Sequence, residues 1–207
     1  MLRCITTTRS TPGQKVALEN DGPEFEGAIA NCAPIVNRMH MRLAAMGLVT
    51  LGKQTPRQMF DGKVLAQIVR AATEALETAK LGRGVLIRIG PGATYTQLGT
   101  MIEEVMELTE HSPVPHTEWG AVREMLGDEL LVRLVGVSAD SMRRYISGER
   151  GTPDDVAARL HFLALVNADL AGSYNDLGLR RWWQRPRRVL EARTWLIGEP
   201  SADIDVS

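Results

Sequence analysis

The segment 138–150 carries polar and charged side chains of the kinds that bind nucleic acid. Its candidate contact residues are Ser138, Ala139, Asp140, Arg143, Arg144, Ser147 and Arg150. Arg143 could donate two hydrogen bonds to a guanine edge, and Arg144 could do the same or grip a phosphate. Ser138 and the free amides of a helix start suit a phosphate oxygen. Asp140 is awkward beside a polyanion unless it accepts from a cytosine amine or orients one of the arginines. These residue types predict contact with double-stranded DNA.

A second group of basic residues surrounds two tryptophans further along the chain. Residues 180–188 read RRWWQRPRR, which places Arg180, Arg181, Arg185, Arg187 and Arg188 around Trp182 and Trp183. Interleaved basic and aromatic residues can neutralise phosphates, and the rings can stack on single-stranded bases. The alternative, which we favour, is that the tryptophans anchor a core or a dimer and the arginines flank them. Contacts of some arginines with phosphate or with a partner are compatible with both interpretations.

The sequence predicts no catalytic residue, metal ligand or cofactor. His111, His116 and His161 have no carboxylate or nucleophile at a sequence spacing that is typical of a catalytic site. Cys4 and Cys32 show no metal-type spacing with the histidines. The glycines at 82, 84, 90 and 92 match neither the dinucleotide-binding fingerprint nor the P-loop. We therefore expect a binding protein and not an enzyme.

The spacing of apolar residues in 128–147 predicts a helix-turn-helix that would hold the arginines in place. The positions expected to be buried between its two helices are Leu131, Val135, Val137, Met142 and Tyr145. Gly136 falls at the turn, where a positive φ is needed, and Ser138 can cap the second helix. We expect Ile146 to point inward with Met142 and Tyr145, and the contact residues to point outward. The alternative is a plain helical hairpin with two solvated arginines.

Other segments with helical periodicity flank this motif, so the fold class is predicted to be mainly α. The expected helices are 24–46, kinked or broken at Pro34; 55–80, capped by Thr55; 94–109; 118–126; and 152–171, capped by Thr152. A β-favouring run at 85–89 is at most one short strand, or else a buried connector. The helix-turn-helix is thus preceded by a helical N-terminal region.

The pattern of breaks divides the chain into four parts. Residues 1–23 are predicted to be a mobile leader, because they lack a sustained apolar period. Residues 24–112 form a helical region of unknown role that could serve dimerisation, and the break at 111–116 is the candidate boundary. Residues 117–179 form the helix-turn-helix domain. Residues 180–207 form the segment rich in arginine and tryptophan and a short tail.

Composition limits the kinds of partner. The 207 residues carry a formal net charge of -1, so any contact with DNA must come from locally clustered arginines and not from bulk charge. No run is long and apolar enough to span a bilayer, and the beginning of the chain lacks the pattern of a secretory signal. We therefore expect a cytoplasmic protein without a membrane partner.

The residues that follow the predicted motif carry a family resemblance. Residues 170–194, LAGSYNDLGLRRWWQRPRRVLEART, come after the helix-turn-helix. In this order, residues 117–194 resemble Xre-type antitoxins with an MbcA/ParS-like toxin-binding tail. The positions that match the tail pattern are Trp182 or Trp183, Pro186, Leu190, Arg193 and Thr194. Ala192 and Trp195 stand where that family usually has glycine and proline, and the following segment, LIGEPSADIDVS, is short and acidic, so we expect a divergent and truncated tail.

The resemblance implies an antitoxin that represses its own operon and binds a RES-type toxin. From the residues alone we expect a sequence-specific DNA-binding transcriptional regulator. A homodimer is expected, because one small helix-turn-helix has limited affinity for DNA. Such proteins usually raise their affinity by binding a palindromic site as a two-fold symmetric dimer. The alternative is a protein-interaction module, an antitoxin-like partner-binding protein without sequence-specific DNA binding.

Overall fold

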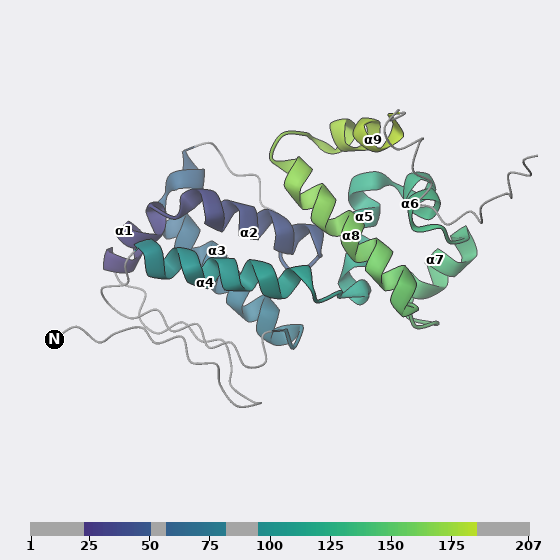
Figure 1. Ribbon diagram of the computed structural model, residues 1–207, viewed down its shortest axis with the longest axis horizontal. Helices are drawn as coiled ribbons and strands as arrows, with labels where there is room; N and C mark the ends of the chain where they lie inside the picture. Colours follow the sequence, from purple (N-terminus) through teal and green to yellow (C-terminus); the bar gives the residue numbers. More distant parts are fainter. Residues whose placement is uncertain (1–22, 51–56, 82–94, 186–207) are drawn as a thin grey trace, which may run out of the picture.

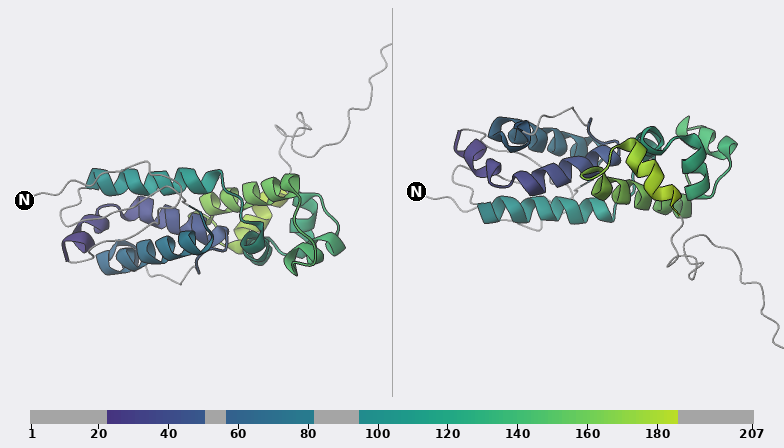
Figure 2. Two further views of the ribbon diagram at one scale, coloured as in Figure 1. Left: turned by 90° about the horizontal axis from the view of Figure 1, so that it is seen from below. Right: turned by 90° about the horizontal axis from the view of Figure 1, so that it is seen from above.

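The computed structural model describes residues 23–50, 57–81 and 95–185. Within these ranges the regular elements are helices and no strand occurs, so the prediction of a mainly α fold is confirmed. The helices form two groups at opposite ends of an elongated molecule (Figures 1 and 2). The predicted strand at 85–89, the leader up to residue 22 and the tail from residue 186 lie outside the described residues.

The first group is a bundle of long helices around one apolar core. It contains α1 (Pro23–Ala30), α2 (Ala33–Ala45), α3 (Gly62–Thr78) and α4 (Tyr95–Glu110), with a short 3-10 helix at Gln58–Phe60. Ile29, Val36, Leu43, Leu65 and Leu98 are fully buried in its core. The bundle therefore has a hydrophobic centre of its own.

Two helix starts in this bundle show how local chemistry sets the boundaries. The chain breaks between α1 and α2, and Pro34 lies in the first turn of α2, which confirms the predicted interruption. The helix predicted over 55–80 begins later, at Gly62. Its cap is Asp61, whose Oδ1 accepts hydrogen bonds from the amides of Lys63 (2.9 Å) and Val64 (3.2 Å). Thr55, the predicted cap, lies outside the described residues.

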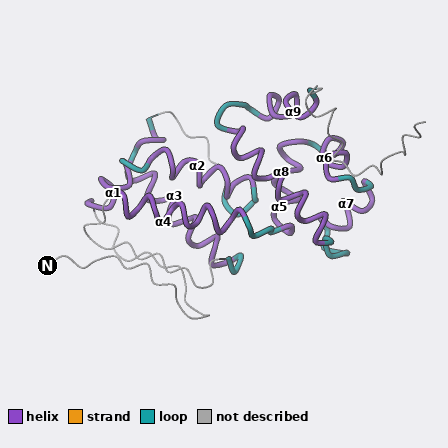
Figure 3. The backbone as a smooth tube through the Cα atoms, viewed as in Figure 1, coloured by secondary structure: helices purple, strands orange, loops and turns teal. Residues whose placement is uncertain are grey.

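The second group consists of the long helix α8 and the shorter helices around it. It contains α5 (Pro115–Leu126), α6 (Asp128–Val135), α7 (Ala139–Ile146), α8 (Asp154–Ala171) and α9 (Asp176–Gln184). Figure 3 shows α6 and α7 at the far end of the molecule from α1. α5 begins at Pro115 and not at Glu118 as predicted, because proline suits a first helical turn. Trp119, Val122, Leu131 and Leu160 are central to the second core.

Close backbone contacts join the two groups at the end of α2. Gly47 has a φ of +72°, and a Cβ there would lie 2.5 Å from the Thr117 carbonyl oxygen. The Thr117 hydroxyl donates to the Met46 carbonyl at 2.7 Å, and Met46 is buried in the second core. Glycine is therefore required at residue 47 for its backbone conformation and for the close approach. The break at 111–116 separates two cores that remain in direct contact.

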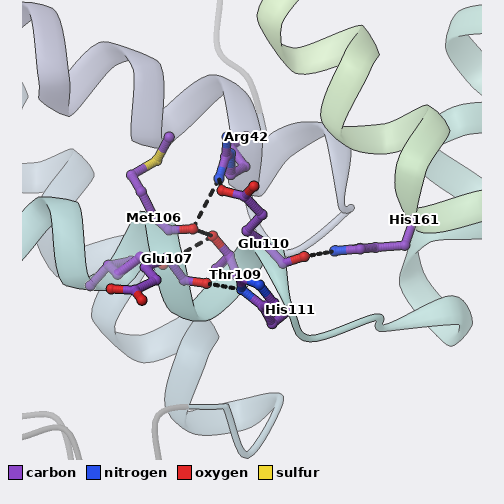
Figure 4. A network of polar contacts seen from close by, with 8 residues as sticks. Arg42, Met106, Glu107, Thr109, Glu110, His111 and His161 are labelled. Carbon is purple, nitrogen blue, oxygen red and sulfur yellow. Dashed lines mark hydrogen bonds and ion pairs between the residues drawn. The ribbon is translucent and has the colours of Figure 1, made fainter. Parts of the chain in front are cut away.

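Polar contacts reinforce this junction from α4 (Figure 4). Arg42 is buried on α2 and donates through Nη1 to the Met106 carbonyl at 2.9 Å. The same nitrogen lies 3.5 Å from a carboxylate oxygen of Glu110. The Glu110 carbonyl also lies 3.1 Å from Nε2 of His161 on α8. The end of α4 thus contacts α2 of the first group and α8 of the second group.

Candidate nucleic-acid interface

The turn between α6 and α7 depends on the backbone freedom of Gly136. Its φ of +74° and ψ of 40° are left-handed, as the sequence predicted. The Gly136 amide donates to the Val132 carbonyl at 2.9 Å, and the Val137 amide donates to the same oxygen at 3.2 Å. Both bonds satisfy the Val132 carbonyl, one of the last carbonyls of α6. A Cβ at residue 136 would meet nothing within 4 Å, so the requirement for glycine is conformational and not steric.

Arg159 of α8 supports the same turn from outside. Its Nε donates to the Val135 carbonyl at 2.8 Å, and its Nη2 donates to Asp155 at 3.0 Å. A cation beside the C-terminus of α6 is also favourable for the helix dipole. The sequence reasoning missed this residue. The spacing of Asp155 and Arg159 signals an ion pair along one helix, but nothing local indicates that Arg159 reaches α6.

α7 is capped at its start and packed on one side, as predicted for Ser138, Met142 and Tyr145. Ser138 Oγ accepts from the Ser141 amide at 3.1 Å. Met142 and Tyr145 are buried, and the Tyr145 ring stacks on Trp119 with 5.7 Å between centroids. This packing fixes the orientation of α7 against α5.

Two predictions around α7 are wrong. Ile146 does not point inward: it is 37% exposed, because it is the last residue of the helix and lies one position around from Tyr145. Thr152 does not cap α8. Its hydroxyl accepts from Nε1 of Trp119 at 2.9 Å, and Pro153 occupies the cap position without a side-chain hydrogen bond. The long-range bond to a buried indole uses the hydroxyl that the local pattern assigned to the cap.

The predicted contact residues of α7 and its exit turn are all exposed. These are Ser138, Ala139, Asp140, Arg143, Arg144, Ser147 and Arg150. Arg143 forms an ion pair with Asp140 one turn earlier, which agrees with the orienting role considered for that carboxylate. Arg144 has no side-chain partner among the described residues. Arg150 places its guanidinium 5.7 Å from the Tyr145 ring centroid. The surface therefore presents three guanidinium groups. Arg143 is held by Asp140, Arg150 lies beside the Tyr145 ring, and Arg144 is held by no described side chain.

The residues of the segment rich in arginine and tryptophan divide between packing and exposure. Arg180 donates to the carbonyls of Met125 (2.8 Å) and Glu124 (3.1 Å), so it fastens α9 to the end of α5. Two backbone acceptors fit the fork of donors on a guanidinium.

Trp183 is also used for packing, whereas other members of the segment face solvent. Trp183 donates to Asn167 at 2.8 Å and packs on the second core, as in the anchoring alternative. Trp182 meets Trp183 edge to face with 5.0 Å between ring centroids. Arg181 and Arg185 are exposed. Arg187 and Arg188 lie outside the described residues.

One buried ion pair was missed by the sequence reasoning. His161 Nδ1 lies 2.5 Å from Glu118 Oε1, although no nearby carboxylate was expected for this histidine. Glu118 is 0% exposed and the His161 side chain 7%, so neither group faces solvent. Burial lowers the pKa of His161. The hydrogen bond and charge of Glu118 and the backbone bonds at Glu110 and Thr109 raise it more, so the pKa lies above its ordinary value. The pair joins α5 to α8 beside the end of α4, where the Glu110 carbonyl lies 3.1 Å from Nε2 of His161.

The described residues contain no group of three or more histidine, cysteine or acidic side chains placed to hold a metal ion. No helix in the same portion is long and apolar enough to cross a membrane. Comparison of the chain with family models, curated proteins and solved structures found no match.

Proposed function

We propose that the chain binds double-stranded DNA sequence-specifically, with α6 and α7 as a helix-turn-helix and α7 as the recognition helix. The observation that carries the proposal is the combination at α7 of a capped N-terminus, one buried side and an outward side whose predicted contact residues are exposed. A recognition helix uses its N-terminal part to reach base edges in the major groove. The Trp119–Tyr145 stack and the Gly136 turn hold this helix on a rigid support.

The restraints on the guanidinium groups support a division of tasks. Arg143, paired with Asp140, is oriented for bidentate bonding to a guanine. Arg144 has no partner among the described side chains and is suited to a phosphate, as is Arg150 beside Tyr145. The N-terminal amides of α7, with the Ser138 hydroxyl, provide a further phosphate contact.

The biological role that we propose is that of an antitoxin-like autorepressor. Its support is the resemblance of residues 117–194 to Xre-type antitoxins, which implies a homodimer, a DNA operator and a RES-type toxin as partner. Within the matched tail, Trp182 and the exposed Arg181 and Arg185 are the described residues that a partner could contact. Trp183 contributes indirectly, because it holds α9 in place through Asn167.

A second candidate is a protein-interaction module without sequence-specific DNA binding. The ion pair of Arg143 with Asp140 favours it, because the pair offsets one of the positive charges available to a phosphate. The exposed apolar side chain of Leu177 on α9 also favours a protein partner. The two candidates differ in whether α7 or α9 carries the binding energy.

A DNA selection followed by salt titration separates the candidates. The full chain would be used to enrich duplexes from a random pool, and binding to the enriched duplex measured by fluorescence anisotropy. Arg143→Ala with Arg144→Ala should weaken binding by at least about 10-fold and reduce the slope of log K against log salt by about one to two. The matched control is Arg38→Ala with Arg57→Ala, which removes the same charge from two exposed arginines of the first group.

The control should leave binding close to wild type. Failure to enrich any duplex, or equal losses in the two double variants, would reject sequence-specific binding through α7. Retention of a RES-type toxin by a chain that enriches no duplex would instead support the interaction module.

A further inference from the structure

His161 on α8 meets a hydrogen-bond acceptor with each of its two ring nitrogens. Nδ1 lies 2.5 Å from Oε1 of Glu118 on α5. Nε2 lies 3.1 Å from the Glu110 carbonyl at the end of α4, the contact drawn in Figure 4. A neutral imidazole carries one N–H and can donate only one of these bonds, so both bonds need an imidazolium. The ring and not the carboxyl holds the proton, because the ordinary pKa of histidine is about two units above that of glutamate.

The carboxylate of Glu118 depends on this proton for its charge compensation. Glu118 is 0% exposed, and its Oε2 has no hydrogen-bond partner among the described residues. When the ring of His161 loses its second proton, one negative charge remains in the interior beside a neutral imidazole. A buried charge without a charged partner is strongly unfavourable until water reaches it. Loss of the proton therefore favours a local opening that hydrates the carboxylate.

The other charges around the ring compensate one another. Arg42 of α2 lies 3.5 Å from the carboxylate of Glu110 and is paired with it. Glu118 is the only charged side chain in the described ranges whose charge shifts the pKa of His161. Together with the backbone bonds at Glu110 and Thr109, it raises this pKa more than burial lowers it. The proton is thus held by Glu118 of α5 and by the last turn of α4.

We infer that the protonated His161, bonded to Glu118 and to the Glu110 carbonyl, is a latch that fastens the end of α4 onto α8 and opens as the pH rises. The neutral ring keeps one N–H, and the carboxylate attracts it more strongly than the carbonyl does. The Glu110 carbonyl then faces a nitrogen lone pair and loses its bond to α8. Residues 111–114, which join α4 to α5 without helical structure, are released with it.

The opening is local, because the rest of the junction does not depend on the proton. α2 packs against α8, and Met46 at the end of α2 is buried in the second core. The Thr117 hydroxyl donates to the Met46 carbonyl at 2.7 Å, and neither group titrates near neutral pH. The two groups of helices therefore stay attached through α2 while the end of α4 is released. The latch does not depend on DNA binding and can be tested without DNA.

The first test locates the proton by NMR of the histidine ring nitrogens in the full wild-type chain. The signals of His161 are assigned by their loss in His161→Gln. At about pH 6.5, where an ordinary histidine is half protonated, both ring nitrogens of His161 should have the shifts of an imidazolium. A pH titration of the same signals then gives the pKa of the closed state.

The second test measures local opening by hydrogen exchange and mass spectrometry, with labelling times matched to the intrinsic exchange at each pH. As the pH rises through the pKa of His161, amides in the last turn of α4 and the first turn of α5 should lose protection. The gain in exchange should approach about 10-fold for each unit by which the NMR pKa exceeds the ordinary value of ~6.5. Peptides from α3 are the internal reference and should keep their protection.

Glu118→Gln tests whether the proton causes this response. The glutamine amide can donate to Nδ1, so a neutral ring keeps its N–H for the Glu110 carbonyl and the latch needs no second proton. The gain in exchange with rising pH should therefore be absent in this variant. The matched control is His116→Gln, which removes an exposed imidazole from the first turn of α5 and should respond as the wild type does.

The wild-type measurements stand even if Glu118→Gln fails to fold. A ring of His161 with one protonated nitrogen at about pH 6.5 would overturn the inference. Equal changes in exchange at the end of α4 and in α3 would overturn it as well, as would the wild-type response in a folded Glu118→Gln chain.

Discussion

Replacement of Glu118 by glutamine should destabilise the protein most strongly in mild acid. In the wild type, the raised pKa of His161 means that the native state holds a proton on this residue more tightly than the unfolded chain does. The resulting stabilisation is complete below the unfolded pKa of about 6.5 and is lost as the pH rises through the higher native pKa. Glutamine keeps an acceptor oxygen for the imidazole but removes the negative charge. Burial then favours the neutral ring.

The size of the effect follows from the cost of removing that proton. At about pH 5, neutralising an ordinary histidine costs about 2 kcal/mol, since each pH unit below 6.5 contributes ~1.4 kcal/mol. The lost attraction in the buried pair adds to this, so Glu118→Gln should lower the free energy of unfolding by about 2–4 kcal/mol at that pH. For a chain of this length the loss corresponds to a decrease in Tm of about 4–15 °C. As the pH rises through the raised native pKa and His161 loses its proton in both proteins, the difference should shrink to under ~1 kcal/mol.

The assay is thermal unfolding followed by circular dichroism in a pH series that starts at about pH 5 and rises through the pKa of His161, which lies above its ordinary value. The control is Asp128→Asn, which breaks a pair of similar length, 2.6 Å to Arg123, whose two side chains are exposed to solvent. Solvent screens that pair, so its loss should change Tm little across the range. A loss in Glu118→Gln that grows with pH, or that matches the control at every pH, would refute the reasoning.

Three further changes test the turn, the recognition surface and the packing of α9. Gly136→Ala should cost about 1–2 kcal/mol of unfolding free energy in chemical denaturation, because alanine is strained at a φ of +74° although space is free around it; an unchanged midpoint would contradict this. Asp140→Asn should release Arg143 and reduce the preference for an enriched duplex over a scrambled one by roughly fivefold in anisotropy, the effect of a ~1 kcal/mol surface pair; an unchanged ratio would show that the pair does not orient the arginine. Trp183→Phe should cost about 1–3 kcal/mol and speed proteolysis near α9, because Asn167 is fully buried and loses its donor; wild-type resistance would count against the anchoring role.

Several features of the interface follow from interactions within a few residues, and the sequence predicted these correctly. The positive φ of Gly136 follows from the need for a left-handed residue between two helices. Ser138 caps α7 because its hydroxyl reaches an amide three residues away. Outside the interface, the predicted break of the helix at Pro34 has an equally local reason, because proline lacks an amide hydrogen. The exposure of Arg143 and Arg144 follows from the same short helical period.

The errors and omissions concern groups whose partners are distant in the chain. Glu118 and His161 are 43 residues apart, and the Arg180 guanidinium bonds to carbonyls 55 and 56 residues away. Thr152 was expected to cap a helix, but it accepts from an indole 33 residues earlier. Local spacing decides which backbone conformations and caps are favourable. The pairing of buried polar groups depends on which helices meet, and only the tertiary structure decides that.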